Sequence, residues 1–158
     1  IKLTQKNWPE YYSTVHESII YLHRVRDLSL NQSSEILKSH ELSVSEFDIL
    51  ATLRRSNKPY ILTPSELQSS LLITSGGLTK LLYQLEAEGL ISRSIHEKDK
   101  RSKLVHLTTK GRKKIELAMA AIHQSLRVWL TNAFGADELK QLSVLLGKAA
   151  KTLEGGSA

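Results

Sequence analysis

The sequence contains no cysteine among its 158 residues. This absence excludes disulfide bonds, thiolate metal sites and cysteine-based redox sensing. No apolar run approaches the roughly 18 residues that a membrane-spanning helix needs, and no signal peptide is visible. We therefore expect a cytoplasmic protein that neither spans nor crosses a membrane, with a chain long enough for one core or two small coupled ones.

Signatures of catalysis and of metal binding are also missing. The sequence has no phosphate-binding glycine loop, no nucleophile elbow and no cluster of carboxylates with a partnered histidine. His16 and His23 are seven residues apart with no carboxylate partner nearby. His96 and His106 would stand in water. We expect no enzyme, no cofactor and no metal site.

The positive charge is concentrated in the middle of the chain. The net charge is +6, and residues 63–114 hold 10 Lys and Arg against 5 Asp and Glu. The segment before them holds 8 against 7 and the segment after them 4 against 4. A localised basic surface attracts a polyanion, usually nucleic acid, although a solvated basic face without a partner would look the same.

Helical periodicity dominates the first part of the chain. Apolar residues at helical spacing predict a helix from about Trp8 to Leu28, with a continuation or a second short helix to about Lys38. Ser43 and Glu46 form a capping-box pattern at the start of the next helix. That helix should bury Phe47 and several aliphatic residues and end before the turn-like "SNKPY".

Two helices separated by a tight turn follow. The pattern "TPSE" (63–66) is a second capping box, with proline at the first helical position of a helix to about Ser70. The next helix begins near Thr74 and ends at Gly89. Such a pair suggests a helix-turn-helix, although many helical bundles contain similar corners.

The second helix of this pair separates an apolar face from a polar one. Its leucines form one stripe, while Thr79, Lys80, Tyr83 and Gln84 point away from it. Gly76 and Gly77 stand in the first turn, where each costs roughly 1 kcal/mol relative to alanine. They would permit close approach of a sugar-phosphate backbone near free helix amides, or they merely relax a tight turn.

A basic hairpin comes next. "LISRSI" (90–95) and "LVHL" (104–107) alternate apolar and polar residues and flank the charged octet "HEKDKRSK". A helix-turn-helix followed by such a hairpin indicates a winged helix, with the octet as the wing tip. The fold class we predict is mainly α with a small β-hairpin wing, flanked by N- and C-terminal dimerisation helices.

The last third is again helical. Thr108 is a candidate N-cap, and an apolar stripe runs from Ile115 to Leu130. A break at "FGAD" (134–137) precedes a final amphipathic helix. The terminal helices have little globular material to cover, so pairing with a second copy would bury them. The expected parts are 1–40 and 108–154 for dimerisation, 41–107 for DNA binding and 155–158 as a flexible tail.

Three motifs in register resemble the MarR family of bacterial winged-helix regulators. They are "LSVSEFDILATL" (42–53), "ITSGGLTKLLYQLEAEGLI" (73–91) and "DKR" with "VHLTTKG" (99–111). The resemblance covers about residues 10–153. It implies a homodimer whose two recognition helices enter successive major grooves of a pseudo-palindromic double-stranded DNA site, with the wings in the flanking minor grooves.

The resemblance also assigns roles to residues. Arg101 would enter a minor groove, with Asp99 steering its guanidinium, while three lysines contact phosphate. The DNA-binding candidates are Thr74, Ser75, Gly76, Gly77, Thr79, Lys80, Tyr83, Gln84, Lys98, Asp99, Lys100, Arg101 and Lys103. Where family members often have Thr-Val-Thr-Arg, this chain has "GLTK" (77–80), so the operator sequence does not carry over.

Members of the family are usually repressors released by small ligands, often phenolic or aromatic anions. The resemblance thus implies an effector site, for which six residues are candidates: Trp8, Tyr11, Tyr12, His16, His40 and Phe47. The alternative is that these side chains form dimer core. For function, the alternative is a winged-helix module that contacts protein rather than DNA.

Overall fold

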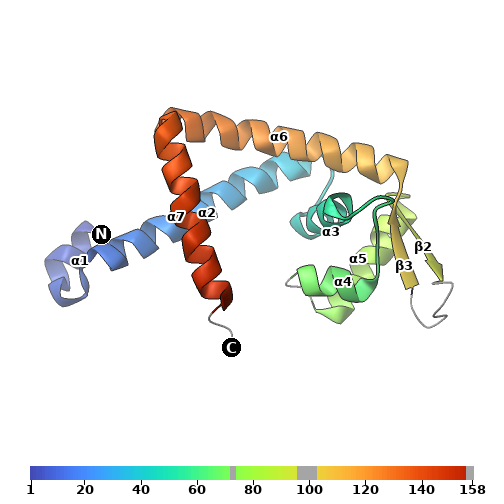
Figure 1. The fold of residues 1–158 in the computed structure, drawn as a ribbon, viewed down its shortest axis with the longest axis horizontal. Helices are drawn as coiled ribbons and strands as arrows, with labels where there is room; N and C mark the ends of the chain where they lie inside the picture. The colour runs from blue at the N-terminus through green and yellow to red at the C-terminus, as the bar shows by residue number, and fades with distance from the viewer. Residues whose placement is uncertain (72–73, 96–102, 156–158) are drawn as a thin grey trace. The chain divides into compact units, whose positions relative to one another are not determined.

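The computed structural model describes residues 1–71, 74–95 and 103–155. They form a mainly helical chain with one small sheet (Figure 1). The elements, in chain order, are α1 (Lys2–Asn7), the 3₁₀ helix η1 (Pro9–Tyr11), α2 (Thr14–Ser39), α3 (Val44–Arg55), β1 (Ile61–Leu62), α4 (Pro64–Ser70), α5 (Ser75–Ala87), β2 (Ile91–Ile95), β3 (Lys103–Leu107), α6 (Thr109–Ala133) and α7 (Ala136–Gly155). The chain divides into two compact units, Ile1–Met119 and a second that begins at Ala120.

The beginning of the long N-terminal helix differs from the prediction. A helix from Trp8 was expected, but α2 begins only at Thr14, after two short helical pieces. Pro9 opens the 3₁₀ turn, and Ser13 caps α2 by accepting a hydrogen bond from the His16 amide at 3.2 Å. From there α2 continues unbroken to Ser39, so the alternative of a continuous helix is correct.

Both predicted capping boxes are present. The Ser43 hydroxyl accepts from the Glu46 amide at 3.3 Å, and the Glu46 carboxylate accepts from the Ser43 amide at 2.8 Å. Thr63 and Glu66 repeat the arrangement at the start of α4. These hydrogen bonds hold the pKa of Glu66 below its usual range, chiefly through the Thr63 amide. α4 ends at Ser70, as the sequence predicted.

The sheet has three antiparallel strands in the order β1-β3-β2. The hairpin pairs Ile91 with Leu107 and Ile95 with Lys103, which confirms the predicted wing strands. β1 was not predicted: Ile61 and Leu62 pair with β3 directly after the turn. The Leu107 amide reaches the Tyr60 carbonyl at 3.1 Å and extends this pairing.

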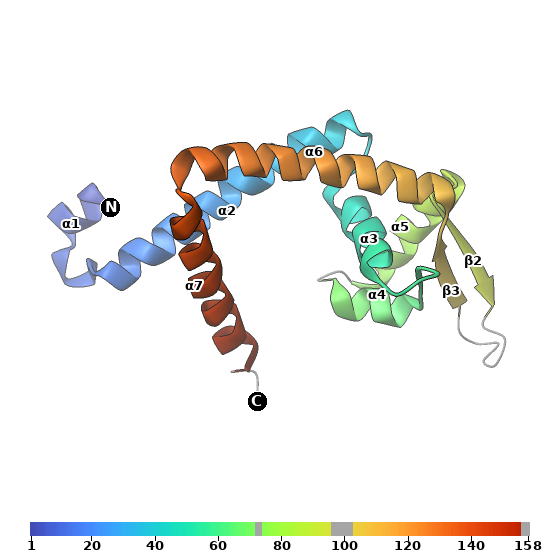
Figure 2. The same ribbon diagram turned by 45° about the horizontal axis from the view of Figure 1, so that its top comes forward.

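The core of the first unit lies where α3, α4 and α5 meet the sheet, beside the ends of α2 and α6 (Figure 2). Fully buried side chains come from every one of these helices and from β2 and β3. They are Leu37, Ile49, Leu50, Leu53, Leu67, Leu85, Leu90, Ile91, Val105 and Ile115. Phe47 was expected in this core but is only half-buried.

The terminal helices leave much of their apolar surface uncovered. Val15, Ile19 and Leu22 on α2 have exposed fractions of 74%, 48% and 49%. On α7, Leu145 and Leu153 are 64% and 78% exposed. In the part of the chain that the structure describes, each helix is too short or too polar to cross a bilayer. The division into dimerisation, DNA-binding and tail segments stays a prediction; its bounds are 1–40, 41–107, 108–154 and 155–158.

Candidate nucleic-acid interface

The α5 helix separates its two faces sharply. Leu78, Leu82 and Leu85 are buried, with Leu85 fully enclosed. The opposite face exposes every candidate DNA-contact residue of this helix except the half-buried Gly77. These exposed residues are Thr74, Ser75, Gly76, Thr79, Lys80, Tyr83 and Gln84. A helix with one polar, basic face standing free is suited to lie in a groove of DNA.

The N-terminus of α5 is capped locally and open to its surroundings. The Thr74 hydroxyl accepts from the Gly77 amide at 3.3 Å, and Thr79 donates to the Ser75 carbonyl at 3.0 Å. A Cβ added to Gly76 would meet nothing within 4 Å, and its φ is not positive. Because neither packing nor backbone conformation requires glycine there, we interpret Gly76 as leaving room for a partner.

The C-terminus of α5 is tied to the start of α6. Gly89 adopts φ +69°, the left-handed conformation expected of a glycine that ends a helix. Thr108 accepts from the Gly111 amide at 3.0 Å, so it caps α6 as predicted, and it donates to the Gly89 carbonyl at 2.8 Å. Lys110 reaches the Glu88 carbonyl at 2.7 Å. These contacts fix the orientation of α5 against the unit.

The wing begins beside α5. Lys103 is exposed at the first position of β3, and a small hollow of about 220 Å³ lies between α5 and the hairpin, lined by Glu86, Arg93 and Lys103 among others. Lys98, Asp99, Lys100 and Arg101 lie outside the described residues. The structure therefore places Lys103 beside the C-terminal half of α5, whereas Thr74, Ser75 and Gly76 lie at the other end of this helix.

Sequence reasoning missed Arg93 and Glu86. Arg93 Nε donates to Glu86 Oε2 at 2.8 Å, and Arg93 Cζ lies 4.2 Å from the centre of the Tyr83 ring. The bond from Arg93 lowers the pKa of Glu86, and the same bond raises the pKa of Arg93. The available signal was the spacing of Tyr83 and Glu86, which places both on the same side of α5.

The candidate effector residues fall into two groups. The rings of Trp8 and Tyr11 lie before α2 with their centres 4.2 Å apart and their planes tilted by 52°, and Tyr12 and His16 follow closely in the sequence. His40 caps the other end of α2, about 36 Å from His16 at 1.5 Å per residue. Phe47 lies on α3, near His40 in sequence. A single chain does not bring the two groups together, and the effector site stays a prediction.

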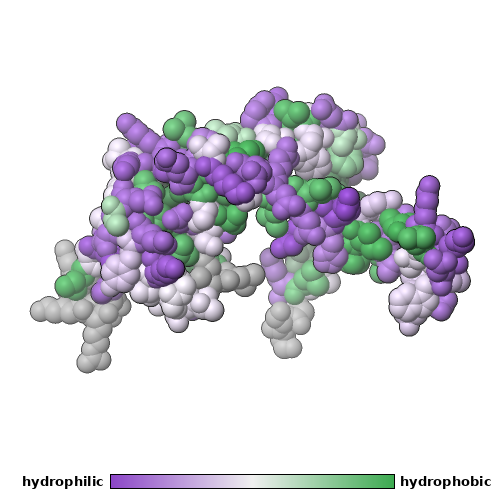
Figure 3. Space-filling model, turned by 180° about the vertical axis from the view of Figure 1, so that it is seen from behind, coloured by the Kyte–Doolittle hydropathy of each residue, from purple (hydrophilic) through white to green (hydrophobic). Residues whose placement is uncertain are grey.

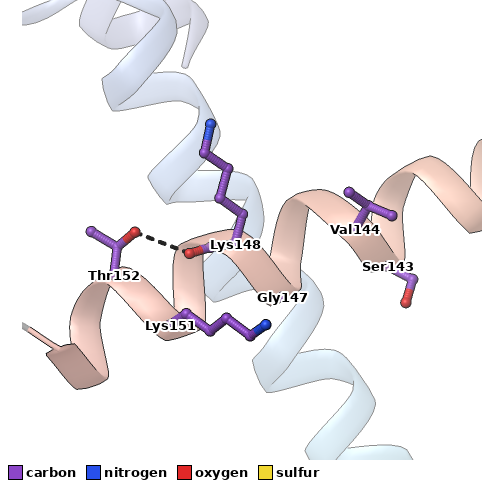
Figure 4. Close-up of a pocket in the computed structure, with 6 residues that line it drawn as sticks. All are labelled: Ser143, Val144, Gly147, Lys148, Lys151 and Thr152. Carbon is purple, nitrogen blue, oxygen red and sulfur yellow. Dashed lines mark hydrogen bonds between the residues drawn. The ribbon is translucent and has the colours of Figure 1, made fainter.

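A hollow of about 610 Å³ is lined by six residues that all belong to α7 (Figure 4). Thr152 there bonds back to the Lys148 carbonyl at 3.0 Å, and Lys148 and Lys151 extend from the helix. All six residues lie on one face of a single helix. Within the described part of the chain, no three His, Asp or Glu side chains cluster as metal ligands would.

Comparison with known proteins agrees with this arrangement. The MarR family profile matches residues 42–103. The HTH-type transcriptional regulator PecS of Dickeya dadantii is 36% identical over 84% of this chain and 79% of its own length. The multiple antibiotic resistance protein MarR of Escherichia coli is 32% identical over 80% of this chain and 86% of its own length.

The chain belongs to the MarR family.

A solved member of the MarR family has a similar fold. A mutant of Escherichia coli MarR complexed with operator DNA matches with a TM-score of 0.65 at 30% identity, over 87% of this chain and 99% of that one. The two-helix pair α4–α5 and the β2–β3 hairpin are thus the helix-turn-helix and wing of a MarR-family protein.

Proposed function

We propose that the chain is a transcriptional regulator that binds double-stranded DNA, with α5 in the major groove and the wing along a flanking minor groove. The observation that carries this proposal is the exposed polar face of α5, opposite its buried leucine stripe and next to a basic hairpin. The operator DNA bound to the related MarR protein supports it. The protein then acts in the cytoplasm, by binding rather than by catalysis.

Different residues contribute different parts of the binding. Thr79, Lys80, Tyr83 and Gln84 face base edges or phosphates in the major groove. Lysines of the wing, together with Thr74 and Ser75 at the start of α5, contact phosphate and so position the protein without reading sequence. Arg101 enters the minor groove, where a narrow A·T-rich segment concentrates negative potential. Asp99 orients that guanidinium.

The binding unit is a homodimer. The exposed apolar residues of α2 and α7 would each cost free energy if left in water, at about 25 cal/mol per Å² of apolar surface. Figure 3 shows apolar side chains reaching the surface where α1 and α2 lie. A second copy would cover these faces, and its two-fold symmetry would match a pseudo-palindromic operator.

Regulation follows from a small ligand that releases the repressor. An aromatic or phenolic anion would suit the tilted ring pair of Trp8 and Tyr11, with Tyr12 and His16 next in the sequence. Since His40 and Phe47 lie at the other end of α2, one site containing all six side chains requires two protomers. The competing role for these residues is dimer core.

Salt dependence of DNA binding tests the proposal. For a dimer that neutralises 6–10 phosphates, affinity for a duplex should fall by about 10³–10⁵ between 50 and 200 mM salt, because bound counterions are released. Arg101→Ala should weaken binding while leaving the dimer and its melting temperature unchanged. A flat salt response would instead indicate a module that contacts protein.

A further inference from the structure

Arg93 lies between two side chains of the recognition helix. From β2 it places its guanidinium carbon 4.2 Å from the centre of the Tyr83 ring. Its Nε donates to Glu86 Oε2 at 2.8 Å, and its Nη2 donates to the same oxygen. The Arg93 side chain is only 15% exposed, whereas Tyr83 is 56% exposed. The arginine is therefore the inner member of the trio and the tyrosine the outer one.

The geometry depends on properties of arginine. Tyr83 and Glu86 are three residues apart on a helix and so face the same side. A planar guanidinium can present its face to a ring and its N–H edge to a carboxylate at the same time, whereas an ammonium has no such face. Arg93 thereby joins the wing strand to the recognition helix through a ring that remains open to a partner.

The charge of Arg93 is already matched. Glu86 accepts two of its hydrogen bonds, and the side chain is mostly covered. An arginine in this state is poorly placed to neutralise a phosphate, unlike the exposed Lys80 on the same helix. Any contribution of Arg93 to DNA binding should then depend on Tyr83, whose ring Arg93 contacts.

We infer that Arg93 is a positioning residue for DNA recognition, which fixes the Tyr83 ring between the helix and the wing. The inference rests on the proposed function. It adds to that function a residue that does not touch DNA, and it explains why an exposed aromatic on the reading face would be held in one orientation. In this arrangement Tyr83 contacts the DNA, Arg93 orients the Tyr83 ring, and Glu86 holds Arg93 in place.

A double-mutant cycle on DNA affinity tests the inference. The probe is a duplex recovered from random DNA with the full wild-type chain. Arg93→Met should weaken binding about tenfold, the lower part of the range for removal of one base-reading side chain. Tyr83→Ala should weaken it by at least as much. In the Tyr83→Ala background, Arg93→Met should have no further effect, because its route to the DNA is gone.

Salt titration separates positioning from direct contact. Arg93→Met should leave the slope of log affinity against log salt unchanged, whereas Lys80→Met should reduce its magnitude by about 1 for each phosphate that is no longer neutralised. If Arg93→Met reduces the magnitude of the salt slope, Arg93 contacts DNA by itself and the inference is wrong. The same holds if the affinity loss of the double variant equals the product of the losses of Arg93→Met and Tyr83→Ala. An unchanged affinity for Arg93→Met or for Tyr83→Ala also overturns it.

The chain offers a matched control for stability. Arg54 lies over the Tyr60 ring at 5.0 Å and pairs with Glu116 at 2.7 Å, a similar trio that contains no side chain of α5 or of the hairpin. Arg54→Met should leave DNA affinity unchanged. If it weakens DNA binding as much as Arg93→Met does, Arg93 only stabilises the fold and the inference is wrong. If Arg93→Met does not fold, Arg93→Lys and Glu86→Gln enter the same cycle with Tyr83→Ala. Absence of salt-dependent binding by the wild-type chain would refute the proposed function itself.

Discussion

Gly111, in the first turn of α6, has no room for a side chain because Leu90 lies against it. A Cβ at position 111 would overlap the Leu90 carbonyl oxygen and lie 2.9 Å from the carbonyl carbon. Leu90 follows the helix-ending Gly89, and the Thr108 amide bonds to its carbonyl at 3.2 Å. The glycine of the "LTTKG" motif therefore allows the end of the recognition helix to pack directly on the next helix.

Gly111→Ala should destabilise the protein. The obstacle is backbone rather than a movable side chain, so the helix start must shift, at a cost of about 1–3 kcal/mol or more. Chemical unfolding followed by circular dichroism measures this change. A Gly111→Ala protein as stable as the wild type would show that the two backbones can separate at no cost.

Gly76→Ala adds the same methyl group to open space on α5. It should leave the free energy of unfolding unchanged or raise it, by up to about 1 kcal/mol, since alanine is the better helix former. DNA binding should nevertheless weaken, because we propose that a sugar-phosphate backbone approaches here. Wild-type affinity in Gly76→Ala would contradict the interpretation of this glycine.

The sequence predicts best those features that depend on neighbouring residues. The capping boxes at Ser43 and Thr63 need only a hydroxyl and a carboxylate three residues apart, and both formed as expected. The end of α5 at Gly89 is equally local. The predicted start of α2 was wrong because it relied on the apolar spacing from Trp8 and ignored two local signals, Pro9 and the N-cap Ser13.

Features that depend on long-range contacts were not predictable in the same way. β1 has only two residues and forms because they pair with the free edge of β3. Arg93 reads as one polar residue in an alternating strand, and only the packing of β2 on α5 gives it Tyr83 and Glu86 as partners. Likewise, the spacing of His16 and His40 along one continuous helix became clear only in three dimensions.

Asp48 should make stability depend on pH. Burial raises the pKa of this α3 carboxyl above 3.8, and the Arg55 charge offsets part of the effect. Below the unfolded pKa both states are protonated and burial of charge costs nothing. As pH rises through the raised folded pKa, the folded state must carry a buried charge, and the free energy of unfolding falls. Asp48→Asn should thus be more stable than the wild type at neutral pH, with the difference shrinking toward pH 3.

Unfolding free energies measured across this pH range check the sign. A difference between Asp48→Asn and the wild type that grows as pH falls would mean that the carboxylate is stabilised in the folded state. The assigned effect of burial would then be wrong.

Leu145→Glu should weaken the homodimer. Leu145 is 64% exposed on α7, on a face that we expect the second copy to cover, so a buried carboxylate would be left unpaired. Sedimentation at micromolar concentration should show more monomer. Ile95→Glu is the control, because Ile95 is 65% exposed on the wing and adds the same charge away from the terminal helices. Equal behaviour of the two variants would argue against α7 as the interface.

Selection of bound sequences from a random duplex pool tests the central claim most directly. Two recognition helices presented by a two-fold dimer should recover an inverted repeat whose half-sites are about one helical turn, 10–10.5 base pairs, apart from centre to centre. Recovery of no sequence preference, or of single half-sites without a fixed partner, would contradict the account.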